Sequence, residues 1–100
     1  MAITKGGCVY ITTNKTHSVL YVGVSSNLTA RIWEHKYKVY PKSFTAKYNC
    51  DKLVYYCFYP AIEEAIGVEK TLKGSSRAHK QKLVTSMNPL WDDLYPQLLE

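Results

Sequence analysis

The chain has 100 residues, enough for one hydrophobic core but too few for a second domain of ordinary size. Its composition is 46% hydrophobic and 21% charged, which excludes a disordered chain. The formal net charge of +5 and the pI near 9.1 favour polyanionic partners, nucleic acid before anionic lipid, although solvated helix faces would explain this charge about equally well.

The basic residues are concentrated in two stretches. From Lys70 to Trp91 there are five basic residues and no acidic one. Residues 31–47 hold another five basic residues, with Glu34 as the one acidic residue among them. Clustering of this kind is typical of surfaces that contact a nucleic-acid backbone.

The cysteines and the apolar segments indicate the cellular compartment of the protein. Cys8, Cys50 and Cys57 are odd in number and contain no C-x-x-C pair, so we expect reduced thiols rather than disulfides or a zinc site. The first fifteen residues lack the apolar segment of a signal peptide, and no apolar run is long enough to span a membrane. We therefore expect a cytoplasmic protein without a membrane partner.

The first two predicted elements form an antiparallel hairpin. Residues 8–12 and 19–24 are rich in β-formers, and residues 14–17 separate them as a polar turn. A four-residue turn pairs Thr13 with Ser18, which places Tyr10 directly opposite Tyr21. Strand alternation then predicts that both hydroxyls project from the same face of the sheet.

The remaining pattern predicts three helices and one more strand, and thus a single domain over residues 1–100. Ser25 or Ser26 can cap the first helix, Gly74 can end the second, and Ser75 or Ser76 can cap the third. A polar loop is expected over residues 41–49, and Trp91, Leu94 and Tyr95 are expected to anchor the C-terminal segment. The expected helices are 27–37, 61–73 and 77–87, and the expected strand is 52–59.

Three polar residues on the predicted helices are candidates for chemistry. Arg31 and His35 are four residues apart, so they form one ridge on the first helix. Glu69 interrupts an apolar stripe that includes Ala65, and a carboxylate facing the core needs a partner. Lys73, one turn later, can supply an ordinary ion pair; a divalent metal ion is the alternative.

Together these residues suit phosphodiester hydrolysis, although each one alone more often has a structural role. Tyr10 or Tyr21 can act as a base or relay, and Arg31 offers a planar fork that matches phosphate oxygens. His35 can transfer protons near neutral pH, and Glu69 can hold one hydrated Mg²⁺. Basic residues of the third helix would contact the flanking backbone.

At these residues the chain resembles the GIY-YIG nuclease superfamily, in particular its small stand-alone bacterial members. Cys8-Val9-Tyr10 occupies the position of the family's first half-motif, Gly-Ile-Tyr. Tyr21-Val22-Gly23 occupies the position of the second half-motif, Tyr-Ile-Gly. The similarity continues through "LTARIWEHK", "EEAIGVEKTLKG" and "MNPLWDDLY", and so covers nearly the whole chain. Cys8 departs from the family's first glycine, Cys57 stands where a glutamate is expected, and "SSRAHK" lacks an expected aromatic residue.

The resemblance implies an α+β fold with a three-stranded antiparallel sheet flanked by helices. It implies one-metal hydrolysis with Mg²⁺ or Mn²⁺ and no small-molecule cofactor, with either tyrosine or the histidine activating water. Arg31 would bind the scissile phosphate, Glu69 the metal, and Gly23 would allow close backbone approach. The full set of implied catalytic residues is Tyr10, Tyr21, Arg31, His35 and Glu69, and the substrate-binding set is Gly23, Lys73, Arg77, Lys80 and Asn88.

The leading hypothesis is a metal-dependent endonuclease that hydrolyses phosphodiester bonds in DNA, in repair or processing; DNA is favoured over RNA, but the sequence does not decide between them. The alternative is a nucleic-acid binding module with weak or no catalysis. A third reading is an interaction domain with an idle site. The sequence does not define an oligomeric state.

Overall fold

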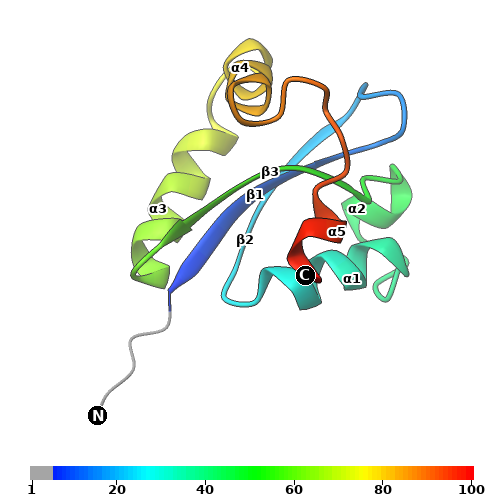
Figure 1. Ribbon diagram of the computed structural model, residues 1–100, viewed down its shortest axis with the longest axis horizontal. Coiled ribbons are helices and arrows are strands. Elements are labelled where there is room, and N and C mark those ends of the chain that lie inside the picture. The colour runs from blue at the N-terminus through cyan, green and yellow to red at the C-terminus, as the bar shows by residue number, and fades with distance from the viewer. Residues whose placement is uncertain (1–5) are drawn as a thin grey trace.

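The computed structural model describes residues 6–100, which form a three-stranded sheet with helices on both of its faces (Figure 1). Residues 1–5, where part of the expectation of no signal peptide falls, lie outside the described residues. No helix within residues 6–100 has the length and apolar character needed to cross a membrane. In chain order the elements are β1 (Gly7–Thr13), β2 (Leu20–Ser25), α1 (Leu28–Lys36), α2 (Phe44–Lys47), β3 (Lys52–Tyr59), α3 (Ile62–Lys73), α4 (Arg77–Met87) and α5 (Tyr95–Leu98).

The sheet has the order β2-β1-β3, and both strand pairs are antiparallel. This confirms the predicted fold class. Strand β1 is central and buried along its whole length. Its alternate side chains therefore enter two cores, one on each face of the sheet.

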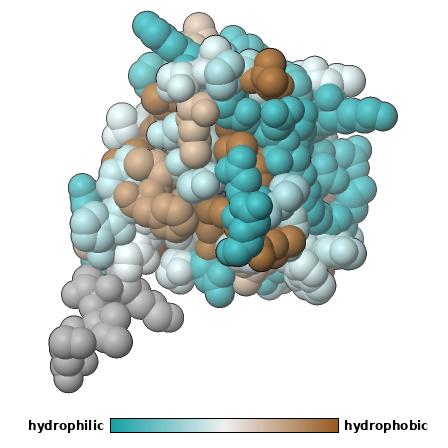
Figure 2. Space-filling view, viewed as in Figure 1, coloured by the Kyte–Doolittle hydropathy of each residue, from teal (hydrophilic) through white to brown (hydrophobic). Residues whose placement is uncertain are grey.

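The two cores use different helices. Val9 and Ile11 pack with residues of α3 and α4, whereas Tyr10 packs with Leu28 and Ile32 of α1. Figure 1 accordingly shows α3 and α4 on one side of the sheet and α1, α2 and α5 on the other. In the same view, Figure 2 shows hydrophilic side chains over the right of the visible face and an apolar patch on its left, beside α3.

The predicted hairpin register is wrong by two residues. The connection spans residues 14–19, so Thr13 pairs with Leu20 and Tyr10 lies opposite Gly23 rather than Tyr21. The carbonyl oxygen of the Asn14 side chain accepts hydrogen bonds from the backbone N–H groups of residues 18 and 19, at 2.9 and 3.1 Å, which stabilises the longer turn. A shift of two preserves strand alternation, so Tyr10 and Tyr21 still share a face.

The helices agree with prediction except in detail. Asn27, not Ser25 or Ser26, caps α1 by accepting a hydrogen bond from Ala30 N–H at 3.2 Å. Ser76 caps α4 as predicted. The expected loop 41–49 contains the short helix α2, capped by Ser43, and residues 95–98 form α5.

Candidate active site

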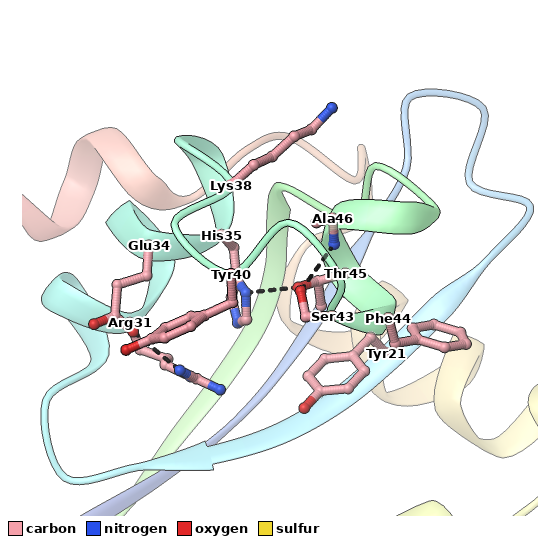
Figure 3. Close-up of a pocket in the computed structure, with 10 residues that line it drawn as sticks. All are labelled: Tyr21, Arg31, Glu34, His35, Lys38, Tyr40, Ser43, Phe44, Thr45 and Ala46. Carbon is pink, nitrogen blue, oxygen red and sulfur yellow. Dashed lines mark hydrogen bonds and ion pairs between the residues drawn. The ribbon is translucent and has the colours of Figure 1, made fainter.

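A cavity of about 230 Å³ opens between α1, α2 and the edge strand β2 (Figure 3). Three of the predicted catalytic residues, Tyr21, Arg31 and His35, line it. Tyr21 comes from β2, and the other two come from successive turns of α1. The predicted ridge on α1 therefore faces the strand that carries the second half-motif.

A buried chain of hydrogen bonds runs beside this cavity. The Tyr10 hydroxyl lies 2.8 Å from His35 Nε2, and the Thr45 hydroxyl lies 2.9 Å from His35 Nδ1. All three side chains are buried. The imidazole is thus held at both nitrogens, and either neutral tautomer satisfies the chain because each hydroxyl can donate or accept.

The surroundings of this chain keep the imidazole neutral. Burial, followed by the positive charge of Arg31, lowers the pKa of His35 to about 4. Burial also raises the pKa of Tyr10 above its ordinary value, and this outweighs the opposing effect of Arg31. At neutral pH both groups are therefore uncharged, and the pair can share or relay a proton without leaving a buried charge.

The two tyrosines of the half-motifs have different environments. Their ring centroids lie 6.3 Å apart, but Tyr10 is fully buried whereas Tyr21 is half-buried and lines the cavity. The Tyr21 ring lies 5.9 Å from that of His35, with their planes at 71°. Tyr21 can therefore touch a molecule in the cavity, whereas the buried Tyr10 hydroxyl is joined to the cavity wall only by its contact with His35.

Arg31 is paired with an acidic residue one turn further along α1. Its Nη1 donates to Glu34 Oε1 at 3.0 Å, and both side chains are partly exposed. The guanidinium carbon lies 5.8 Å from the centroid of the Tyr40 ring. A phosphate that binds the remaining donors of Arg31 lies close to the Glu34 carboxylate, whose negative charge opposes its binding.

Glu69 does not line this cavity, and it comes from α3, which lies across the sheet from α1 (Figure 1). Its Oε2 is 3.1 Å from Lys73 Nζ, and its side chain is 14% exposed. Lys73 Nζ in turn lies 5.7 Å from the centroid of the Tyr21 ring. The carboxylate therefore has the ordinary ion pair that its sequence position allows, and Lys73 links it to the cavity.

The side chains around Glu69 offer a metal ion few protein ligands. Among residues 6–100, no group of three or more histidine, cysteine or acidic side chains lies close enough to hold one. A single accessible carboxylate fits Mg²⁺ or Mn²⁺ that keeps most of its water ligands, and it does not fit a fully protein-bound ion. Glu69 is the residue that would hold such an ion, in place of its ion pair with Lys73.

Two residues predicted to contact substrate have other roles here. Gly23 is buried because the Tyr10 ring covers it, so the close approach it permits is to that ring. Asn88 is 6% exposed, and its Nδ2 donates to Val54 O at 3.2 Å and to Asp92 O at 2.8 Å. Its Oδ1 accepts from Asp92 N–H at 3.1 Å, so Asn88 holds the C-terminal segment against β3 and has no free group for a substrate.

The predicted basic contacts lie around the β2 edge. Lys73 and Lys80 line a second hollow of about 290 Å³, which shares Tyr21 and Phe44 with the cavity. Arg77 is exposed and donates to the backbone oxygen of His17 at 2.9 Å. Lys73 and Lys80 are therefore beside the site, whereas Arg77 is occupied at the hairpin turn.

Sequence reasoning missed three residues of the site. Thr45 fixes His35, Glu34 pairs with Arg31, and Phe44 stands between the two hollows. The three-residue spacing of Arg31 and Glu34 on a helix could have indicated their pairing. Nothing in the sequence indicated Thr45 or Phe44, because α2 was predicted as a loop.

Residues 6–83 match the family of GIY-YIG catalytic domains, and the chain belongs to this family. The match confirms the resemblance seen in the half-motifs, and it implies nuclease-type hydrolysis of phosphodiesters. The solution NMR structure of the UPF0213 protein BH0048 from Bacillus halodurans is similar, with 27% identity and a TM-score of 0.55 over 88% of this chain and 92% of that one. A comparison with curated proteins finds no significant match.

Proposed function

We propose that the protein is a metal-dependent endonuclease that cleaves DNA in repair or processing. The main support for this proposal is that Tyr21, Arg31 and His35 line one cavity of a GIY-YIG catalytic domain. The positive net charge and the lysines of the neighbouring hollow favour a polyanionic substrate.

The roles follow from the accessibility of each group. Arg31 binds the scissile phosphate with its planar fork. Tyr21 orients the attacking water with its hydroxyl, since Tyr10 is covered by protein. His35 stays neutral and is fixed between Tyr10 and Thr45, so it can receive or return a proton at the cavity wall.

Glu69 is the proposed ligand of Mg²⁺ or Mn²⁺. When bound, such an ion neutralises charge on the phosphate and the leaving group. Lys73 Nζ lies 3.1 Å from this carboxylate, and it would be free to contact the DNA backbone if Glu69 held the ion.

The test is cleavage of labelled single-stranded, branched and duplex DNA with Mn²⁺ or Mg²⁺. Glu69→Gln should reduce the rate by at least about a hundredfold, the loss of several kcal/mol of metal stabilisation. Tyr21→Phe removes only the hydroxyl and should cost about a hundredfold or more. Glu64→Gln, on the exposed face of the same helix, is the matched control and should cleave at the wild-type rate.

Wild-type cleavage by Glu69→Gln would exclude the metal role. The second candidate, a nucleic-acid binding module, is favoured by one observation: Arg31 and Glu69 are both already paired with protein side chains. Steeply salt-dependent binding without turnover on any of these substrates selects that function instead.

A further inference from the structure

Phe44 and Tyr48 form an exposed aromatic ridge beside the candidate active site. Phe44 is 47% exposed and Tyr48 is 40% exposed, and their ring centroids lie 4.7 Å apart. The Phe44 ring also stacks on Tyr21, at 5.8 Å and 28° (Figure 3). The aromatic ridge thus continues outward from a ring that lines the cavity.

The position of this ridge between two cationic hollows is informative. Phe44 lines both the cavity that contains Arg31 and the second hollow that contains Lys73 and Lys80. Lys47 Nζ lies 5.4 Å from the centroid of the Tyr48 ring. Positive charge therefore flanks the aromatic rings on both sides.

This arrangement suits a nucleic-acid strand whose bases are unpaired. A strand with phosphates on Arg31 and on the lysines would have to pass Phe44, which lines both hollows, and the face of an unpaired base could stack on its ring. Bases inside a duplex have their faces covered by their neighbours and cannot do so. Proteins that bind single strands combine cationic grooves with exposed aromatic rings in this way.

We propose that the aromatic ridge of Phe44 and Tyr48 stacks unpaired bases, so that the substrate is a single-stranded segment of DNA. This rests on the proposed endonuclease function for the identity of the polymer. It adds that strand recognition depends on base faces as well as on phosphate charge.

Binding without divalent metal separates this proposal from catalysis. Fluorescence anisotropy in EDTA compares oligothymidylate of about ten nucleotides with an abasic strand of equal length and charge, and with a hairpin duplex. The wild type should bind oligothymidylate more tightly than either of the other two. Equal or tighter binding of the duplex, or of the abasic strand, overturns the proposal.

The variants test the ring face directly. Phe44→Leu keeps apolar bulk and should weaken oligothymidylate binding about five- to a hundredfold, while binding of the abasic strand is unchanged. Tyr48→Leu provides the second test if Phe44→Leu does not fold. Phe58→Leu is the control, since Phe58 is 64% exposed on β3 and lines neither hollow.

The proposal is overturned if Phe44→Leu and Tyr48→Leu lose equal affinity for oligothymidylate and for the abasic strand, or if they lose no affinity. Tighter binding of oligouridylate with the same dependence on Phe44 overturns the assignment to DNA. If binding depends on the bases but no substrate is cleaved, only the proposed endonuclease function is rejected. If DNA is cleaved with no dependence on Phe44 or Tyr48, the stacking proposal fails alone.

Discussion

The ring of Tyr10 lies over the backbone of Gly23, its partner on the neighbouring strand. A Cβ atom at position 23 would overlap the Cζ and hydroxyl of that ring, which is fully buried and cannot move aside. The glycine of the second half-motif is therefore required by the tyrosine of the first. The two half-motifs act as one packing unit, and they need not both contact substrate.

Gly23→Ala should destabilise the fold by about 1–3 kcal/mol, the usual cost of overpacking a core. It should also displace the Tyr10 hydroxyl from His35. Urea unfolding measures the free energy of unfolding. Gly67→Ala is the matched control: Gly67 lies in α3 with open space around it, so alanine should stabilise by about 0.5–1 kcal/mol. A Gly23→Ala protein as stable as the wild type would contradict the packing argument.

Two buried threonines provide a second comparison. Thr45→Val removes the hydroxyl that bonds His35 Nδ1 and should cost about 1–3 kcal/mol, since a buried polar nitrogen loses its partner. The Thr12 hydroxyl is buried and has no hydrogen-bond partner within residues 6–100. Thr12→Val should therefore be neutral or stabilising. Thermal unfolding measures the stability of both variants. Equal losses of stability in the two would show that the hydrogen bond to His35 does not stabilise the fold.

The three strands and the three longer helices could be predicted from local pattern, because they are set by alternation and capping, whereas the short helices α2 and α5 were not predicted. The predicted 52–59 strand and 77–87 helix match β3 and α4. The hairpin register could not be predicted, because it depends on the Asn14 side chain and on a positive φ of 59° at His17. Strand alternation survived that error, so both tyrosines were still placed on the correct face.

The candidate site was less predictable because its contacts join distant segments. Helical spacing placed Arg31 beside His35, but it gave no sign of Thr45, which reaches the imidazole from α2. Glu69 was identified as a carboxylate that needs a partner, and spacing allowed both Lys73 and a metal ion. Asn88 illustrates the limit of motif matching, since its amide is used entirely within the protein.

The depressed pKa of His35 makes stability depend on pH. The unfolded imidazole has the ordinary value of 6.5 and the folded one about 4, so between these values the unfolded state binds more protons. The contribution of His35 to the free energy of unfolding is therefore fully present above pH 6.5. It falls by about 3 kcal/mol as the pH is lowered from 6.5 to 4. The stability difference between wild type and His35→Gln should shrink by that amount over this range. An NMR titration that places the His35 pKa near 6.5 would contradict this.

The Arg31–Glu34 pair should limit the affinity for DNA. Glu34→Gln removes the carboxylate that competes with phosphate for the guanidinium, so binding of a DNA strand should tighten up to about fivefold, the value of a partly exposed ion pair. Glu63→Gln changes the net charge equally from the first turn of α3 and is the control. Anisotropy at two salt concentrations measures both variants. If Glu34→Gln gains no more affinity than Glu63→Gln, or keeps its gain when Arg31 is also changed to alanine, the effect is general charge and the ion pair does not restrain Arg31.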